Sequence, residues 1–253
     1  MPNAWVVVPT YNEADNIEDL VNQLLALPVD LGVIVVDDAS PDGTGALADG
    51  LVSANDGRVR AIHRPGKLGL GTAYIAGFRR AFQEDAAHIL TMDADFSHHP
   101  RYIPAMLDKS AQADLIVGSR YVPGGGTHNW PWHRRVLSRM ANGVARAALG
   151  LKAHDVTAGF RCYRRQALET VPLDSILSHG YSFLVEMLFM VQRRGWSVDE
   201  VPIIFEDRQR GKSKISQVEI FKAMLTVLRL FWRRLFREPR PSPARPPAQD
   251  VAP

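Results

Sequence analysis

Short runs rich in valine and isoleucine alternate with helix-like segments along the first half of the chain, and this alternation constrains the fold more than any other feature. The runs span residues 5–10, 32–38, 59–64, 88–93 and 114–120. Between the first two runs, apolar residues recur with helical spacing at Ile17, Leu20, Val21, Leu24 and Leu25. Strands that alternate with helices predict an α/β fold with a mostly parallel central sheet, covered by helices on both faces.

Polar residues follow several of these runs at the point where each run ends. The ends read Pro9-Thr10-Tyr11-Asn12-Glu13, Asp37-Asp38, Asp93-Ala94-Asp95 and Gly118-Ser119-Arg120. Open α/β sheets bind ligands outside the carboxyl ends of their strands. We therefore expect these residues to gather at one binding site.

The sequence LTMDADFSHHP contains two of these acidic residues, Asp93 and Asp95. Side chains two residues apart in an extended chain point the same way, so the two carboxylates are predicted to converge. Paired oxygen ligands of this kind suit Mg²⁺ or Mn²⁺. The alternative is that Asp95 caps a helix that starts near Pro100. Because the pair follows a core strand and lies beside other polar strand ends, we favour the metal site.

The sequence VVDDASPDGTG follows the second run and combines a turn with two further carboxylates. Asp42-Gly43 is typical of a turn, and Ser40 or Asp42 is suited to cap the next helix. We therefore assign Ser40, Asp42 and Gly43 to local structure. Asp37 and Asp38, directly at the strand end, are better candidates for contacts with the base or ribose of a nucleotide.

Charge is distributed unevenly along the 253 residues. Residues 208–240 hold ten lysines or arginines and two acids, a net charge of +8, which leaves −5 on the rest of a chain whose total is +3. A strongly basic end predicts an anionic partner there. The single cysteine, Cys162, excludes an intramolecular disulfide and a Cys-based zinc site. The first residues lack the basic start of a signal peptide, and no window reaches the roughly 18 consecutive apolar residues of a membrane span.

Residues 216–236, SQVEIFKAMLTVLRLFWRRLF, are predicted to form a helix with two faces. The apolar stripe comprises Phe221, Met224, Leu225, Leu228, Phe231, Trp232 and Leu235, and the mainly basic one Lys222, Thr226, Arg229, Arg233 and Arg237. A basic amphipathic helix with aromatic residues suits an anionic bilayer surface, with its arginines on lipid phosphates. An ordinary helix docked on the core is an equal alternative for its first half. The predicted organisation is a catalytic domain at 1–214, a basic amphipathic helix at 215–238 and a Pro-rich, disordered tail at 239–253.

The order of the motifs makes a family resemblance specific. PTYNE, VVDDASPDGT, GLGTA, MDADFSHHP and GSRYVPGG follow one another as in family 2 glycosyltransferases. NWPWHRRVLS, DVTAGFRCYRR and FEDRQRGKSK resemble the polyprenol-phosphate mannosyltransferases, the dolichol-phosphate mannose synthase group. The resemblance covers about residues 4–232. It implies a nucleotide-diphosphosugar transferase fold, which is Rossmann-like, with GDP-mannose as donor and an inverting transfer to a lipid phosphate.

The resemblance also implies which residues bind the nucleotide sugar. The positions that match those holding guanosine are Pro9, Tyr11, Glu13, Val36 and Asp38. The metal and diphosphate motif is matched by Asp93, Ala94 and Asp95, and the metal itself, Mg²⁺ or Mn²⁺, is expected on the two aspartates. Some family members have glutamine at the position of Ser97. Because serine is shorter, a water between Ser97 and the metal is expected rather than a direct bond.

The implied catalytic set combines one of these carboxylates with residues from later motifs. Its members are Asp95, Arg120, Arg134, Ser138 and Arg208. The match gives Arg120 to the sugar and phosphate side of the donor, and Arg134 and Ser138 to the acceptor phosphate. Arg208 and Lys214 match a basic pair that closes on the diphosphate.

The residue chemistry agrees with this assignment. The acceptor is already an anionic phosphate, so no strong general base is required, and no histidine or serine nucleophile arrangement is evident. His98, His99 and His179 are interpreted as packing or polar loop residues. The leaving diphosphate instead needs a divalent cation and fixed arginines, whose planar forks suit phosphate. Glu186 lies in the apolar run YSFLVEMLFMV and is either a buried structural acid or a residue near the sugar.

Other functions remain open at this point. Within the glycosyltransferases, the donor sugar could be glucose or another hexose. From other classes, a nucleotidyltransferase shares this type of sheet, and a nucleotide-sugar binding protein would lack catalysis. We expect a peripheral location on the cytoplasmic side of a membrane, with the Arg134-Arg135 pair near its surface. A membrane-protein partner could supply part of the anchoring, and no nucleic-acid partner is expected.

Overall fold

The structure is a computed structural model that describes residues 2–178, 180–207 and 217–236. Its strands are β1 (Ala4–Thr10), β2 (Leu31–Asp37), β3 (Val59–His63), β4 (His88–Thr91), β5 (Leu115–Ser119), β6 (Gly126–His128), β7 (Arg161–Arg164), β8 (Val198–Pro202) and β9 (Ile204–Glu206). Its helices are α1 (Ile17–Leu25), α2 (Thr44–Ala54), α3 (Leu70–Phe82), α4 (Ile103–Lys109), α5 (Trp132–Leu149), α6 (Arg165–Glu169), α7 (Tyr181–Arg193) and α8 (Gln217–Phe236), with short 3₁₀ turns η1 (Pro100–Tyr102) and η2 (Leu173–Ser175). All five predicted strands are present, as is the C-terminal helix.

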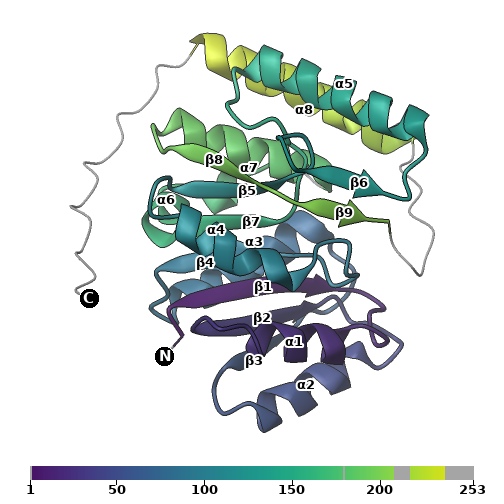
Figure 1. The fold of residues 1–253 in the computed structure, drawn as a ribbon, viewed down its shortest axis with the longest axis vertical. Coiled ribbons are helices and arrows are strands. Elements are labelled where there is room, and N and C mark those ends of the chain that lie inside the picture. Colours follow the sequence, from purple (N-terminus) through teal and green to yellow (C-terminus); the bar gives the residue numbers. More distant parts are fainter. Residues whose placement is uncertain (1, 179, 208–216, 237–253) are drawn as a thin grey trace.

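Seven strands form the central sheet in the order β3-β2-β1-β4-β7-β5-β8 (Figure 1). Neighbouring strands pair in parallel except at β7, which runs antiparallel to both β4 and β5. The chain runs outward from β1 to β2 and β3, then returns to place β4 on the other side of β1. Ligands bind beyond the carboxyl ends of the strands where the order reverses in this way. The mostly parallel sheet is thus confirmed, with one reversed strand near its centre.

Helices cover both faces of the sheet. Trp5 and Val7 of β1 pack in a core with residues of α3 and α7, whereas Val6 and Val8 pack in a second core with residues of α1, α2 and α4. This division follows the strand pleat, which turns successive side chains to opposite faces. Helix α3 approaches β1 so closely that a Cβ added to Gly77 would overlap Cγ1 of Val7. Burial on both sides explains why the strand runs are continuously apolar.

Cys162 lies in the reversed strand β7, near the centre of the sheet. It is paired with Leu90 of β4 on one side and with Ile116 of β5 on the other. The side chain is fully buried, and burial raises the pKa of its thiol to about 12. The thiol is therefore protonated and shielded at neutral pH.

Helices α5 and α8 lie side by side at the upper end of the molecule in Figure 1. Many of their large apolar side chains are exposed, and we call these the α5/α8 apolar surface. It comprises Trp132, Val136, Leu137, Met140 and Val144 of α5 and Met224, Leu225, Leu228, Trp232, Leu235 and Phe236 of α8. In the part of the chain that the structure describes, no helix combines the length and apolar character needed to traverse a bilayer.

Two arginines of α8 lie at a buried carboxylate of α7, and this finding corrects one expectation. Arg229 pairs with Glu186 of α7 at 2.6 Å, and Arg233 lies 3.7 Å from the same carboxylate. Glu186 is fully buried, so the interpretation as a buried structural acid is confirmed. The expectation that these two arginines face lipid phosphates is wrong, because both are committed to a carboxylate of the core.

The structure also corrects the geometry predicted around the acidic pair. Strand β4 ends at Thr91, so Asp93 and Asp95 lie beyond it and not in extended chain. The turn η1 that follows is capped by His99, whose ring accepts a hydrogen bond from the backbone N–H two residues later (3.1 Å). The alternative that Asp95 caps this segment is therefore wrong.

Candidate functional site

The loops that follow β1 and β2 are bonded to each other at the carboxyl edge of the sheet. The backbone N–H of Asn12 donates to Oγ of Ser40, and that of Ala14 donates to Oδ2 of Asp42, both at 3.0 Å. The other oxygen of Asp42 accepts hydrogen bonds from the backbone and hydroxyl of Thr44, at 3.1 and 2.6 Å. Ser40 and Asp42 therefore shape the turn.

The adjacent aspartates at the end of β2 have different surroundings. Asp37 accepts hydrogen bonds from the hydroxyls of Thr10 (3.0 Å) and Ser40 (2.5 Å). Asp38 is buried, pairs with Arg64 at 2.6 Å and accepts two backbone N–H bonds from the loop after β3. Asp37 thus braces one loop, while Asp38 holds the next loop and its arginine at the same edge.

The remaining predicted nucleoside positions lie on the same strand ends. Pro9 and Val36 are register partners in β1 and β2. Val36 is fully buried, so any part that it has in binding falls to its backbone. Tyr11 is half-exposed, and the ammonium of Lys67 lies 3.9 Å from its ring centroid. Glu13 is half-buried and accepts a hydrogen bond from the asparagine three residues later (2.8 Å).

The acidic pair lies beyond β4, beside these loops. Oδ1 of Asp93 accepts a hydrogen bond from the hydroxyl of Tyr74 (3.2 Å), and Oδ1 of Asp95 accepts one from the backbone N–H of Ser97 (3.0 Å). Nδ1 of the buried His98 lies 3.9 Å from Oδ2 of Asp93. Burial lowers the pKa of His98, and the carboxylates of Asp93 and Asp95 oppose this shift. Both carboxylates therefore act electrostatically on the same buried imidazole.

Uncharged groups surround the pair from the core side. Tyr74 is fully buried, and burial, reinforced by the charge of Asp93, raises the pKa of its hydroxyl well above the ordinary value. It therefore remains a hydrogen-bond donor to Asp93. His98 packs against the rings of Phe160 and Phe205, as the packing interpretation predicted.

The donor set fits a hard divalent cation. Asp93 and Asp95 supply carboxylate oxygens, and the buried Oγ of Ser97 has no hydrogen-bond partner among the described residues. Within the same residues, no group of three or more His, Cys, Asp or Glu side chains is arranged to hold a metal. A cation on this pair would take its other ligands from water or a bound phosphate, as Mg²⁺ commonly does.

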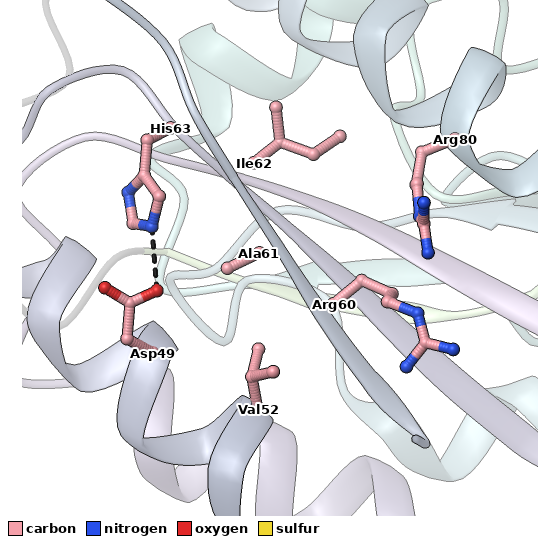
Figure 2. A pocket seen from close by; sticks show the side chains of 7 residues that line it. All are labelled: Asp49, Val52, Arg60, Ala61, Ile62, His63 and Arg80. Atoms are coloured by element: carbon pink, nitrogen blue, oxygen red, sulfur yellow. Dashed lines mark hydrogen bonds and ion pairs between the residues drawn. The ribbon is translucent and has the colours of Figure 1, made fainter.

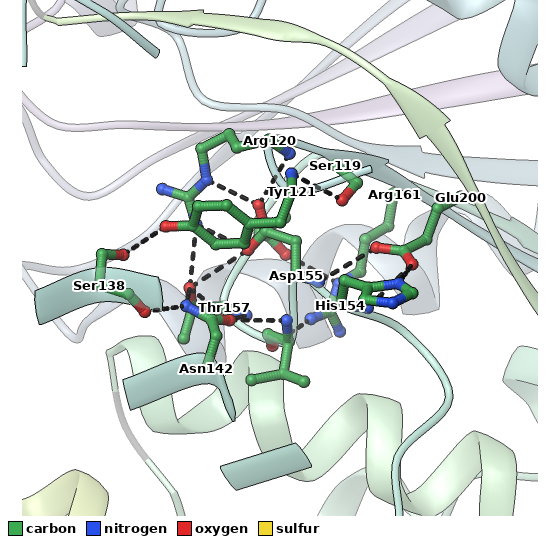
Figure 3. A network of polar contacts seen from close by, with 12 residues as sticks. Ser119, Arg120, Tyr121, Ser138, Asn142, His154, Asp155, Thr157, Arg161 and Glu200 are labelled. Carbon is green, nitrogen blue, oxygen red and sulfur yellow. Dashed lines mark hydrogen bonds and ion pairs between the residues drawn. The ribbon is translucent and has the colours of Figure 1, made fainter. Parts of the chain in front are cut away.

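The guanidinium of Arg120, the residue after β5, is paired with the buried carboxylate of Asp155 (Figure 3). Its Nε and Nη2 donate to the two oxygens of Asp155 at 2.6 and 2.7 Å, and Nη2 also donates to Thr157 at 3.0 Å. Three aromatic rings have their centroids 5.2–5.4 Å from its guanidinium carbon: Tyr121, Trp130 and Phe205. This two-bond pairing fixes the orientation of the guanidinium.

The predicted acceptor residues lie in the first turns of α5, next to two of these rings. The guanidinium of Arg134 lies 4.0 Å from the ring centroid of Trp130 and pairs with Asp207 at 2.9 Å. Oγ of Ser138 shares a 2.6 Å hydrogen bond with the hydroxyl of Tyr121 (Figure 3). The structure thus brings Arg134 and Ser138 to the aromatic residues that flank Arg120.

Some predicted residues lie outside the part of the chain that the structure describes. They are Arg208, Lys214, His179, Arg237 and the tail at 239–253. Conversely, sequence reasoning missed the supporting residues Arg64, Tyr74 and Asp155. Asp155 opens the motif DVTAGFRCYRR, which gave a signal, whereas an aromatic residue in an amphipathic helix, such as Tyr74, gives none.

A separate hollow of about 440 Å³ lies along the outer edge of β3 (Figure 2). Its lining residues are Asp49, Val52, Arg60, Ala61, Ile62, His63 and Arg80. Asp49 and His63 share a 2.8 Å hydrogen bond there. None of the predicted site residues lines this hollow, so the candidate site remains the one at the strand ends.

Known proteins resemble this chain over most of its length. The family model described as "Glycosyl transferase family 2" matches residues 5–171. A polyprenol monophosphomannose synthase of Mycolicibacterium smegmatis is 47% identical over 223 residues, covering 88% of this chain and 84% of the relative. An undecaprenyl-phosphate mannosyltransferase of Micrococcus luteus is 44% identical over 223 residues, covering 88% and 91%.

Solved structures show the same fold at much lower identity. The glucosyl-3-phosphoglycerate synthase of Mycobacterium tuberculosis, with Mn²⁺, UDP and glucosyl-3-phosphoglycerate, matches with a TM-score of 0.62 at 17% identity, covering 91% of this chain and 80% of that one. The same synthase with Mg²⁺ and UDP matches with a TM-score of 0.63 at 20% identity, with the same coverage. This likeness concerns the fold alone, and it confirms the predicted nucleotide-diphosphosugar transferase architecture.

Proposed function

The chain belongs to glycosyl transferase family 2, and from this premise we propose that it transfers mannose from GDP-mannose to a polyprenol phosphate, with inversion at the anomeric carbon. The family predicted from the motifs is confirmed, and the chain is a glycosyltransferase. One observation carries the proposal further. Two relatives with 47% and 44% identity across 88% of the chain are named for mannose transfer to polyprenyl phosphates.

The nucleotide sugar is assigned to the site at the carboxyl ends of the strands, which we call the strand-end site. The guanosine lies along Pro9, Tyr11, Glu13, Val36 and Asp38 in this proposal. Asp93 and Asp95 hold Mg²⁺ or Mn²⁺, in keeping with the metals that accompany UDP in the synthase of like fold. When bound, the cation acts as a Lewis acid that stabilises the charge on the departing diphosphate. Arg208 and Lys214 remain predicted partners of the diphosphate.

Protein groups then orient the two reacting phosphates. Arg120, fixed by its two bonds to Asp155 (2.6 and 2.7 Å), supplies positive charge on the donor side of the site in this proposal. Arg134 and Ser138 bind the acceptor phosphate, whose oxygen attacks the anomeric carbon while the bond to the diphosphate breaks. Fixed donors of this kind stabilise developing charge without reorganising during the reaction. Because the attacking oxygen is already anionic, no side chain has to remove a proton.

The α5/α8 apolar surface supports a peripheral place on a membrane. The acceptor's tail stays in the bilayer, since each buried CH₂ contributes roughly 0.8 kcal/mol. The enzyme must therefore come to the lipid headgroup. Eleven large apolar side chains, from two helices that lie side by side, are exposed and suited to insert at the interface, and Arg134 belongs to one of these helices.

A panel of radiolabelled nucleotide sugars, incubated with short polyprenol phosphates and Mg²⁺ or Mn²⁺, tests the donor and acceptor. Label that enters the lipid from GDP-mannose in preference to other donors supports the proposal. Preferred transfer from UDP-glucose would establish the glucose alternative. Release of pyrophosphate from a nucleoside triphosphate would establish a nucleotidyltransferase, and donor binding without transfer a binding protein.

The stereochemistry of the product tests the single displacement. An α-linked donor is expected to give a β-linked mannosyl phosphate, which NMR of the purified lipid distinguishes from the α anomer. An α-linked product or a trapped glycosyl-enzyme would instead show a covalent nucleophile.

A further inference from the structure

Helix α8 buries several polar residues and exposes several large apolar ones, although its inward face also includes the fully buried Leu230 and the partly buried Val227 and Phe231. Thr226 is buried, and the side chains of Arg229 and Arg233 are only 33% and 30% exposed. On the other face, Leu228 and Trp232 are 53% and 50% exposed. A surface helix of a globular protein ordinarily turns its apolar stripe to the core. The inward face of α8 is therefore mixed, and polar contacts act together with the packing of Leu230 to set the rotation of the helix.

Those polar contacts centre on Glu186, in the middle of α7. Oε2 of Glu186 accepts hydrogen bonds from Nη2 of Arg229 and from Oγ of Ser178, both at 2.6 Å. Nη1 of Arg233 lies 3.7 Å from Oε1. The carboxylate has no exposed surface, and a buried carboxylate is tolerated only when a cation and hydrogen bonds compensate for lost hydration.

Both cations in this cluster come from α8, four residues apart, and this spacing favours the observed rotation of the helix. Residues i and i+4 lie on the same helix face, so pairing Arg229 and Arg233 with one carboxylate turns the opposite face outward. A second contact fixes the end of the helix, because Nη1 of Arg234 donates to the backbone oxygen of Ala148 in α5 (2.8 Å). The outward face of α8 thereby joins the exposed stripe of α5.

We propose that Glu186 is a positioning residue for use of the lipid acceptor, because its buried carboxylate locks α8 in the rotation that presents the α5/α8 apolar surface to the bilayer. This inference rests on the proposed function. Glu186 acts through α8, so its effect is expected on acceptors presented in a membrane and not on the chemical step itself.

Glu84 provides a matched control. It is also a buried glutamate that pairs with two arginines, Arg60 at 2.8 Å and Arg80. This second cluster lies between β3 and α3, far from α8 (Figure 1). Glu84→Gln therefore reproduces the loss of a buried carboxylate without touching the docking of α8.

The test compares full-length wild type, Glu186→Gln and Glu84→Gln by vesicle co-sedimentation and by kinetics. Acceptors are a long-chain polyprenol phosphate in anionic vesicles and a short-chain, water-soluble analogue. For Glu186→Gln we expect about 10-fold weaker vesicle binding and a similar rise in KM for the vesicle acceptor, with kcat for the soluble acceptor unchanged. Glu84→Gln should match wild type in all three measurements.

Two outcomes would overturn the inference. Vesicle binding by Glu186→Gln equal to that of wild type would show that the carboxylate does not set the surface. An equal loss of kcat with the soluble acceptor would place Glu186 at the reaction itself. Wild-type protein that transfers no sugar to either acceptor would instead refute the proposed function.

Variants on the α8 side keep the test decisive if Glu186→Gln does not fold. Arg229→Gln should reproduce the vesicle defect, and Arg229→Lys, which keeps the cation, should restore most of the binding. Arg135→Gln removes the same charge from an exposed position of α5 and leaves the contacts of α8 with Glu186 and Ala148 in place, so it should have a smaller effect. Equal defects in Arg229→Gln and Arg135→Gln would reduce the effect to net charge and overturn the inference.

Discussion

The strand-end site and the α5/α8 apolar surface solve opposite problems of solvation. At the strand ends, charged groups are drawn inward, as in the buried pairs Asp38–Arg64 and Asp155–Arg120. On the α5/α8 apolar surface, large apolar groups are left outside, and Trp132 is 71% exposed. Burying charge and exposing apolar area both reduce the stability of the free protein. Each is expected where a ligand completes the surroundings, phosphates in one case and a bilayer in the other.

The two regions are therefore expected to fail independently. Damage to the strand ends should remove turnover and leave membrane binding intact. Damage to the α5/α8 apolar surface should weaken membrane binding and leave the turnover of a soluble acceptor intact. Any variant that disturbs both equally would show that the two regions are mechanically coupled.

The largest effect is expected for Asp93→Ala or Asp95→Ala. Loss of a metal-bound carboxylate removes several kcal/mol of charge stabilisation, so turnover should fall by at least about 100-fold. Transfer assays with and without EDTA, together with circular dichroism and vesicle binding, provide the measurements. Asp49→Ala, an exposed carboxylate in the hollow beside β3, serves as the control. Retained activity in EDTA, with either mutant near wild type, would contradict the metal site.

A second prediction concerns the α5/α8 apolar surface. Replacing Leu137 and Leu228 with glutamine removes two exposed leucines, each of which contributes about 1.5 kcal/mol or more when buried in an apolar phase. Binding to anionic vesicles should weaken by about 100-fold, with turnover of a short soluble acceptor unchanged. Leu68→Gln, at an exposed leucine outside this surface, should bind vesicles like wild type. Undiminished binding by the double variant would exclude the α5/α8 apolar surface as the membrane contact.

The variant Asp155→Asn tests what a buried ion pair at the strand ends contributes to turnover and to stability. The substitution leaves the guanidinium of Arg120 with a neutral partner, so its orientation is less firmly held. Turnover should fall by about 10-fold, and breaking a buried ion pair should lower the free energy of unfolding by about 3 kcal/mol. Steady-state kinetics and urea unfolding measure the two effects. A loss of stability without any change in kcat would limit Asp155 to a structural part.

The smallest effect is expected for Tyr74→Phe. One hydrogen bond to Asp93 is lost at 3.2 Å, and a net contribution of about 0.5–1.5 kcal/mol predicts roughly 3-fold weaker Mn²⁺ binding. Calorimetric titration of the purified protein with Mn²⁺ measures this directly, apart from activity. An unchanged affinity would show that the tyrosine only fills the core.

The sequence predicted the carboxyl edge of the sheet well because local signals suffice there. Valine-rich runs identified β1 and β2, and polar residues at their ends placed Tyr11 and Asp38 at that edge, while their contacts with a nucleotide stay predictions. The reversed strand β7 was missed, since four residues with an arginine at each end, RCYR, carry no strand pattern. Asp155 lies 35 residues from Arg120 in the chain, so only folding reveals their pairing.

Helix α8 shows the limit of pattern reasoning most clearly. Its pattern separated Leu228 from Arg229 as observed, but Phe231, assigned to the apolar stripe, packs against the core. The pattern also does not say which face is buried. The answer lies in Glu186, 43 residues earlier, which attracts the basic face. The amphipathic pattern of a helix separates its two faces, and contacts with another element decide which face is buried.

The buried thiol of Cys162 makes it possible to measure how often the central sheet opens. A thiol with a pKa of about 12, enclosed between β4 and β5, reacts with an alkylating reagent only after those strands separate. Because thiolate is the reactive form, the labelling rate at neutral pH follows the opening of the sheet. Pulsed alkylation read by mass spectrometry would thus count opening events at the centre of the molecule. Since the label lies in neither region compared above, it separates a variant that loosens the whole sheet from one that alters only its own surface.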